Sequence, residues 1–134
     1  LTVLYESALQ HLADRPESYL AQPADVQRFL TELPTTWDET RLVSGYPGVS
    51  VAIARCKDGV WYVGGLNGTE APMDMPMDWS FLSRENYGLT LFLDSGDKEN
   101  PWKIETLEGD KDNLLPELNL QPRGGFVAVV KRLK

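Results

Sequence analysis

Residues 35–68, TTWDETRLVSGYPGVSVAIARCKDGVWYVGGLNG, decide the fold because they hold three predicted strands and two turns without a gap. Over 49–56, larger residues alternate with small ones, and this period of two gives a strand one branched apolar row on one face. Asp58-Gly59 tolerates positive φ, so it predicts a reversal into an antiparallel partner over 60–67. A turn signal before the hairpin separates it from a first strand over 40–44.

Glycines interrupt the second strand of this hairpin. Gly64 and Gly65 predict either a β-bulge or the close approach of another part of the backbone. Asn67-Gly68-Thr69 meets the glycosylation sequon, but Asn-Gly is first of all a turn former, so we expect it to end the strand.

Strand patterns continue to the end of the chain. The Met and acidic residues of 73–79 alternate around a proline, which predicts an edge strand. Other strand patterns lie at 89–94, 102–106, 118–120 and 126–130, the last being a continuous apolar run typical of a central strand. We therefore predict a mainly β fold, an antiparallel two-layer β-sandwich of about seven or eight strands.

The first 34 residues, here called the lead, have a helical pattern. Ser7 and Gln10 match a capping box and predict a short helix that runs to about Ala13 and is stopped by Pro16. One further turn is expected over 17–21. The clearest helix follows Pro23, and its apolar residues repeat at i, i+3, i+4 and i+7: Val26, Phe29, Leu30 and Leu33. Residues 35–134 then form the sandwich.

Composition narrows the class of protein. The 134 residues include 42% hydrophobic ones, enough for one domain with a real core. A formal net charge of -7 would repel phosphate backbones, so nucleic acid is not an expected partner. The basic residues near the C-terminus are expected to be a solvated end of the chain. No apolar run approaches the roughly 20 residues of a membrane helix, so no membrane partner is expected either.

The start of the chain leads to two expectations. The residues LTVLYES show no signal peptide, and they lack an initiator Met. We therefore expect a piece of a longer protein, although a processed product would look the same.

The residues of the chain predict no catalytic, cofactor or metal site. Cys56 and His11 are each the only residue of their kind, which excludes a disulfide within the chain, a multi-thiolate metal site and a two-histidine metal site. His11 lies among apolar residues of the predicted short helix, and we expect it on the helix surface or in packing, not in a catalytic triad. Asp38 and Glu39 are adjacent on an extended segment, so they point to opposite faces and are poorly placed as a glycosidase pair. The acidic loop 94–100 has oxygen ligands that suit calcium but no EF-hand spacing, and we expect a hairpin turn.

Aromatic residues raise one alternative function. A β-rich domain can bind an oligosaccharide by stacking sugars on exposed rings, and the same rings can equally serve core or interface packing. Both possibilities stay open for the five candidates Trp37, Trp61, Tyr62, Trp79 and Trp102.

Three motifs in order carry a family resemblance: SALQHLADRPESY, LPTTWDETRLVSGYPG and VAIARCKDGVWYVGGLNG. Together they resemble the C-terminal part of glycoside hydrolase family 97, by motif over 5–68 and by strand pattern further on. The family comprises bacterial α-glucosidases and α-galactosidases, many of them periplasmic. They have an N-terminal β-super-sandwich, a catalytic (β/α)8 barrel that works with calcium, and a C-terminal β-sandwich.

The resemblance implies that 1–21 is the last strand and helix of the barrel and that 35–134 is the sandwich. It also implies catalytic and calcium-binding carboxylates upstream, and no position of this chain matches them. The expected role is a non-catalytic accessory domain that contacts the catalytic barrel and can self-associate. The alternatives are a carbohydrate-binding module and a stand-alone interaction domain.

Overall fold

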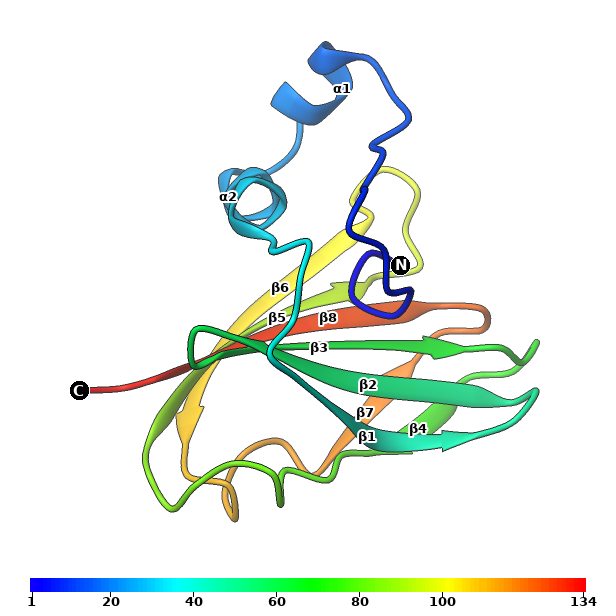
Figure 1. Cartoon of the computed structure of the whole chain (residues 1–134). Coiled ribbons are helices and arrows are strands. Elements are labelled where there is room, and N and C mark those ends of the chain that lie inside the picture. The colour runs from blue at the N-terminus through cyan, green and yellow to red at the C-terminus, as the bar shows by residue number, and fades with distance from the viewer.

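The computed structural model describes residues 1–134 as two antiparallel sheets preceded by two short helices (Figure 1). The helices are α1 (Pro16–Leu20) and α2 (Ala24–Glu32). The strands are β1 (Glu39–Tyr46), β2 (Ser50–Lys57), β3 (Val60–Asn67), β4 (Met73–Pro76), β5 (Tyr87–Asp94), β6 (Trp102–Gly109), β7 (Glu117–Leu120) and β8 (Gly125–Arg132). Six strands form one sheet in the order β1-β2-β3-β8-β5-β6, and β4 pairs with β7 in the second. The predicted mainly β, antiparallel fold with helices near its N-terminus is confirmed.

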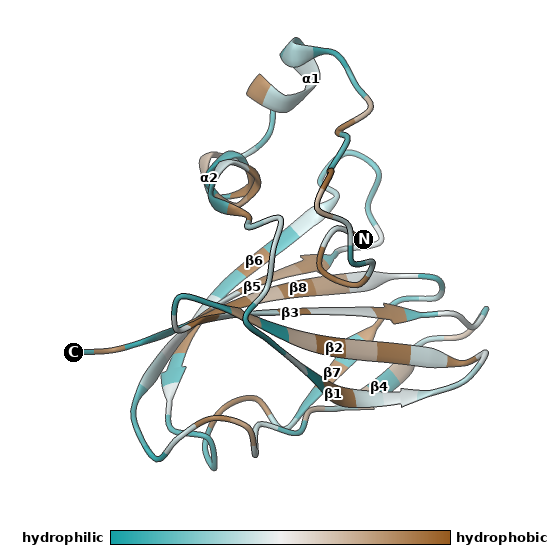
Figure 2. Ribbon diagram, viewed as in Figure 1, coloured by the Kyte–Doolittle hydropathy of each residue, from teal (hydrophilic) through white to brown (hydrophobic).

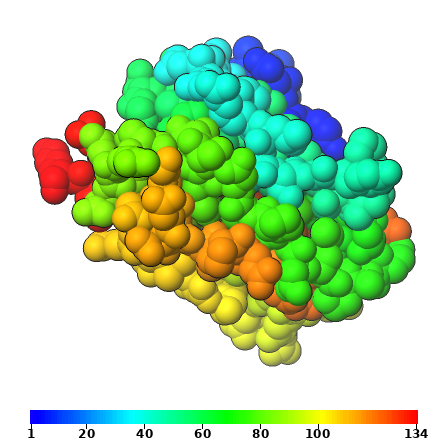
Figure 3. Space-filling view, turned by 90° about the horizontal axis from the view of Figure 1, so that it is seen from below, coloured from blue at the N-terminus to red at the C-terminus, as the bar shows by residue number.

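The core lies between the six-stranded sheet and the side where β4, β7 and their loops pack. Alternate residues of the strands supply it, as with Leu89, Leu91 and Leu93 of β5. Strand β8 runs between β3 and β5, which agrees with the continuous apolar run that predicted a central strand. Brown bands along the strands in Figure 2 trace this pattern. In Figure 3, viewed from below, the segments around β4 (green) and β7 (orange) lie together across the face opposite the helices.

The hairpin of β2 and β3 has the turn that its sequence predicts. Asp58 and Gly59 both have positive φ, 49° and 78°. The register then runs without a break past Gly64 and Gly65, so β3 has no bulge. Instead, the glycines permit close approach, because a Cβ at Gly64 would lie 3.1 Å from Cβ of Val3 and one at Gly65 would overlap the Phe126 ring. The sheet's register irregularity lies in β1, between Leu42 and Ser44.

The prediction of a helix over 7–13 is wrong, because this segment is irregular in the structure. The capping residues do bond locally, because Gln10 Nε2 donates to the Ser7 carbonyl and the Ser7 hydroxyl bonds both the amide and the carbonyl of Leu9. Leu9 and Leu12 remain exposed, however, and so short a helix is not stable in water without a packed apolar face. Pro16 begins a helix instead of ending one.

Helix α2 and strand β4 agree with their predictions. Val26 is buried, and Phe29 lies with its ring centroid 5.5 Å from that of Phe92 on β5. Strand β4 pairs on one side only, with β7, and Met75 is fully buried while Pro76 ends the strand. Neither helix is long and apolar enough to cross a membrane.

Candidate functional site

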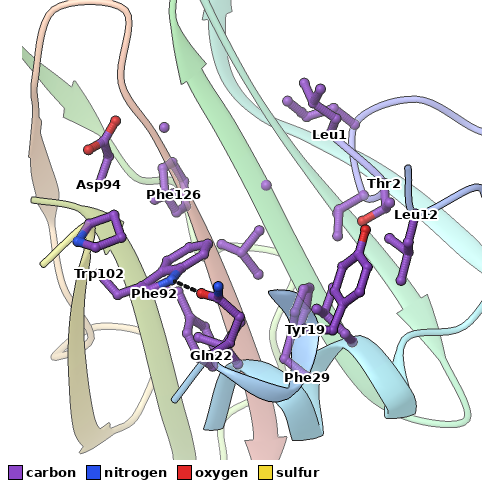
Figure 4. A pocket seen from close by; sticks show the side chains of 18 of the residues that line it. Leu1, Thr2, Leu12, Tyr19, Gln22, Phe29, Phe92, Asp94, Trp102 and Phe126 are labelled. Carbon is purple, nitrogen blue, oxygen red and sulfur yellow. Dashed lines mark hydrogen bonds between the residues drawn. The ribbon is translucent and has the colours of Figure 1, made fainter. Parts of the chain in front are cut away.

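The lead packs on the face of the six-stranded sheet that points away from β4 and β7, here called the lead face (Figure 1). A groove of about 690 Å³ lies between the lead and this face. It is bordered by 1–4, 11–14 and helix α2 on the lead side, and by β3, β5, β6 and β8 on the sheet side. Most of its lining is apolar, as the close-up in Figure 4 shows.

Arg55 fixes the start of the lead on the sheet. Arg55 is 5% exposed, and its guanidinium donates through Nε to the Val3 carbonyl at 2.6 Å and through Nη2 to the Leu4 carbonyl at 3.2 Å. Nη1 donates to Thr40 Oγ1 at 3.0 Å and lies 3.5 Å from a carboxylate oxygen of Glu6. A planar fork of donors suits two successive carbonyls, which a lysine could not hold in the same way. We call this set of contacts the Arg55 anchor.

The anchored residues form a turn. The amides of Leu4 and Tyr5 both donate to the Leu1 carbonyl, at 3.0 and 2.9 Å. Within this chain the carbonyls of Val3 and Leu4 go to Arg55 and no strand pairs with these residues, and their assignment to the last strand of a barrel stays a prediction. The missing side chain of Gly64 lets the turn descend onto β3.

The sequence offered one signal for this anchor that our prediction did not use. Arg55 continues the row Val49, Val51 and Ile53, so it puts a charge in an otherwise apolar row of a strand. Buried arginines of this kind are paired or hydrogen-bonded, and the two carbonyls that Arg55 holds are more than 50 positions away in the sequence.

The five aromatic candidates do not gather on one surface. Trp61, Tyr62 and Trp79 are buried, and Trp79 donates through Nε1 to the Leu115 carbonyl at 2.7 Å. Trp37 is half-buried and meets Tyr62 edge to face with centroids 5.5 Å apart. Trp102 is 41% exposed at the groove, where its Nε1 donates to Gln22 Oε1 at 2.8 Å (Figure 4). The structure therefore presents one exposed indole, not a row of coplanar rings.

The acidic loop after β5 uses its carboxylates to hold its own backbone. Asp94 accepts from the Gly96 amide at 3.0 Å, and Asp97 accepts from the Glu99 amide at 2.9 Å. These are the local bonds of a hairpin turn, as expected for 94–100. No group of three or more His, Cys, Asp or Glu side chains in the structure is placed to hold a metal ion.

Asp38 and Glu39 take separate roles. Lys57 Nζ donates to Asp38 at 2.9 Å and the Asp58 amide donates to its other oxygen, also at 2.9 Å. The bond from Lys57 and then that from the Asp58 amide lower the pKa of Asp38, and the bond to Asp38 raises the pKa of Lys57. Glu39 pairs with Arg41 on the same strand. The two carboxylates therefore stabilise the hairpin and its edge.

Asn67 ends β3 as the turn signal predicted, but it is only 2% exposed. Its amide nitrogen donates to the carbonyls of Ala71 and Gln121, and its oxygen accepts from the amide and hydroxyl of Thr69. All the polar atoms of this side chain are used inside the fold. The sequon is thus a structural element.

Comparisons with known proteins agree with the two-sheet fold described above. Residues 36–131 match the family described as "Glycosyl-hydrolase 97 C-terminal, oligomerisation". The chain is 37% identical over 134 residues to a retaining alpha-galactosidase of Bacteroides thetaiotaomicron, covering 98% of this chain and 20% of that protein. It is 52% identical over 65 residues to a probable retaining alpha-galactosidase of Streptomyces bingchenggensis, covering 48% of this chain and 10% of that one.

Two solved structures contain a region with the same fold as this chain. A beta-arabinopyranosidase crystal structure superposes with a TM-score of 0.79 at 30% identity, over 96% of this chain and 20% of that one. A family 97 glycoside hydrolase from Pseudoalteromonas sp. strain K8, in complex with acarbose, gives 0.74 at 24% identity, over 90% and 20%. The chain thus spans about a fifth of the length of these solved proteins. From the family match and the eight-stranded sandwich together, we conclude that this chain belongs to the family of glycoside hydrolase 97 C-terminal oligomerisation domains.

Proposed function

We propose that this chain is the non-catalytic part of a longer glycoside hydrolase, in which it associates with further copies and holds them together. One observation carries the proposal. The residues that match the oligomerisation family, 36–131, are the residues that form the sandwich, and the interior of this sandwich is filled by apolar side chains. Because the interior is packed, a partner would bind to the surface of the sandwich. For the whole enzyme we propose a retaining glycosidase acting on α-galactosides, from the names of the relatives.

Within the longer enzyme, residues 1–21 are proposed to be the last strand and helix of the catalytic barrel, the rest of 1–34 to be the connecting helix, and 35–134 to be the association domain. Apolar side chains stay exposed along the lead, at Leu1, Tyr5, Leu9, Leu12 and Leu20. Side chains of this size, repeated within twenty residues, favour a packing partner over solvent. The Arg55 anchor would then set the position of the barrel relative to the sheet.

Two further parts of the proposal come from the resemblance alone. The parent enzyme is proposed to be periplasmic, and its calcium to be held by residues upstream of this chain. A carbohydrate-binding role is not favoured, because stacking needs exposed rings and three of the five candidates are buried.

An experiment with a fusion protein tests the association role. The 134-residue chain is joined to the C-terminus of a monomeric fluorescent protein, and native mass spectrometry reports the mass of the product. We expect dimers or larger assemblies of the fusion, and monomers of the fluorescent protein alone. A fusion that stays monomeric would contradict the proposal.

An activity assay tests the non-catalytic part. The isolated chain should not hydrolyse p-nitrophenyl α-galactoside or α-glucoside. Turnover that survives repurification and persists at constant specific activity would overturn this part of the proposal.

A further inference from the structure

An apolar strip stays open on the lead face beside the lead. It consists of Leu42 on β1, Val51 and Ile53 on β2, and Leu66 on β3. Leu42 lies opposite Ile53, and Val51 lies opposite Leu66. Residues directly opposite each other in an antiparallel pair point to the same face, as do residues two apart on one strand, so the four side chains share one surface. We call this set the outer strip.

The outer strip borders the anchored start of the lead. Arg55 follows Ile53 by two positions on β2, so both side chains point to the lead face, where Arg55 holds the lead. Leu66 and Leu1 both line the groove beneath the lead. Leu66 also lines a second hollow, of about 490 Å³, beside the turn between β1 and β2. The strip therefore continues from the lead toward the free edge of the sheet at β1 (Figure 1).

Both faces of the strands are apolar at this place. Ala52, Ala54 and Val63, which lie between the strip positions, are buried in the core. The strip itself is not buried, because Leu42 is 70% exposed and its other three members are half-buried. An antiparallel sheet with one face in water normally has polar residues on that face, and a contiguous apolar patch marks a contact with a partner. The outer strip thus requires a partner that the isolated chain does not supply.

The start of the lead indicates which partner this is. The chain covers 20% of the retaining alpha-galactosidase and matches a family of C-terminal domains, so in the proposed longer enzyme most of the polypeptide precedes Leu1. That polypeptide arrives at the lead face, because the Arg55 anchor holds the carbonyls of Val3 and Leu4 on the sheet. An extended residue spans at most about 3.6 Å, so the residues just upstream of Leu1 stay close to the outer strip.

This attachment favours the upstream polypeptide over a second copy of the chain. A tethered segment is present at a roughly millimolar effective concentration, whereas a free copy loses translational and rotational freedom when it binds. Leu1 is 72% exposed and shares the groove with Leu66, so an upstream segment that packs on Leu1 reaches the strip as well.

We propose that the outer strip is the surface on which the upstream part of the same polypeptide docks, through an apolar face that buries Leu42. The proposal rests on the proposed function, in which this chain is part of a longer enzyme, and it specifies where the two parts meet. Self-association would then use other surfaces of the sandwich.

Hydroxyl-radical footprinting of the longer enzyme, read by mass spectrometry, tests the docking surface. Leu42 and Leu133 are probes of the same chemistry, and in this structure they are 70% and 37% exposed. An open strip would therefore be labelled faster at Leu42. We expect the opposite order, with labelling of Leu42 about fivefold slower than that of Leu133, because the centre of a packed interface excludes water. Leu133 is the internal control, since it follows β8 and is not part of the strip.

A substitution at Leu42 tests the same contact from the other side. Leu42→Glu brings a charge to the contact and should raise the labelling of Leu66 about threefold, as the upstream part separates from the strip. Leu133→Glu is the matched control and should leave the labelling of Leu66 unchanged. Leu42→Ala removes the side chain without adding charge, and it decides the matter if circular dichroism shows Leu42→Glu to be misfolded.

Sedimentation velocity of the same samples separates this proposal from the association role. Slow labelling of Leu42, with a Leu42→Glu enzyme that is opened at Leu66 and keeps the wild-type mass, supports the docking surface. A Leu42→Glu enzyme that dissociates into smaller assemblies would show that the strip lies between copies, which overturns the docking surface and leaves the association role standing. Faster labelling of Leu42 than of Leu133, or unchanged labelling of Leu66 in the folded Leu42 variants, also overturns the docking surface. A wild-type enzyme that is monomeric throughout contradicts the association role alone.

Discussion

At the scale of single residues, long-range contacts explain why particular side chains are where they are. Arg55 holds the lead, Gly64 makes room for it, and Asn67 bonds two loops that are far apart in sequence. Each is a polar or small residue inside a strand pattern, where local propensity alone would favour a branched apolar one. The patterns show that these positions are unusual, but only the fold supplies their partners.

Replacing Arg55 by Lys should release the start of the lead. Lysine keeps the charge but cannot reach the carbonyls of Val3 and Leu4 together, so we expect a loss of about 1–3 kcal/mol in the free energy of unfolding. Hydrogen exchange measured by mass spectrometry should be faster in residues 1–6 and nearly unchanged in β8. Arg41→Lys on the exposed edge is the control. Undiminished protection of the lead in Arg55→Lys would show that the anchor does not hold it.

Gly65→Ala should destabilise the sandwich. The new methyl carbon would stand 2.9 Å from Cζ of Phe126 and closer still to Cε1, so the ring must move within a packed core. Overpacking of this kind costs about 1–3 kcal/mol. Gly109→Ala is the control, because its nearest contacts are at an ordinary 3.4 Å. Urea unfolding measures both variants, and equal midpoints would contradict the close packing of Phe126 on Gly65.

Asp38 should make the hairpin sensitive to acid. Because its pKa is lowered in the fold, its contribution is present above the unfolded pKa of about 4 and is lost as the pH falls through the folded value. The Asp38→Asn variant should therefore have a lower melting temperature than the wild type near neutral pH, and the difference in melting temperature should vanish in acid. Thermal melts recorded from neutral to acidic pH measure this difference, and Asp112→Asn is the control for removal of a carboxylate. A difference that persists at low pH would speak against the ion pair with Lys57.

At the scale of elements, the sequence was most informative where hydrophobic period and turn chemistry agreed. Alternation and a positive-φ turn specified the β2–β3 hairpin, and the spacing of Val26, Phe29 and Leu30 specified α2. The segment 7–13 failed because a capping box predicts where a helix can start, whereas packing decides whether it persists. The groove could not be predicted, since it depends on how the lead crosses strands that are distant in sequence.

The docking of α2 depends on Phe29. Phe29→Ala removes a ring packed on Phe92, and we expect α2 to loosen with a loss of about 2 kcal/mol, below the cost for a fully buried phenylalanine. Acrylamide should then quench Trp102 more strongly than in the wild type, because Gln22, its hydrogen-bond partner, precedes this helix. Thr31→Ala on the exposed side of α2 is the control. Unchanged quenching in Phe29→Ala would contradict the account of this packing.

At the scale of the whole molecule, the sandwich has a packed interior and one sheet face that the lead covers. Its interior is filled by apolar side chains, and the lead covers part of one face of the larger sheet. The sequence predicted the two layers and the lead, because both follow from local periodicity.

The central claim is that this chain associates with itself, and sedimentation equilibrium of the wild-type 134-residue chain tests it most directly. The account predicts a mass that rises with concentration from that of one chain, 15.0 kDa, to twice that value or more. A single-chain mass up to several hundred micromolar would contradict it.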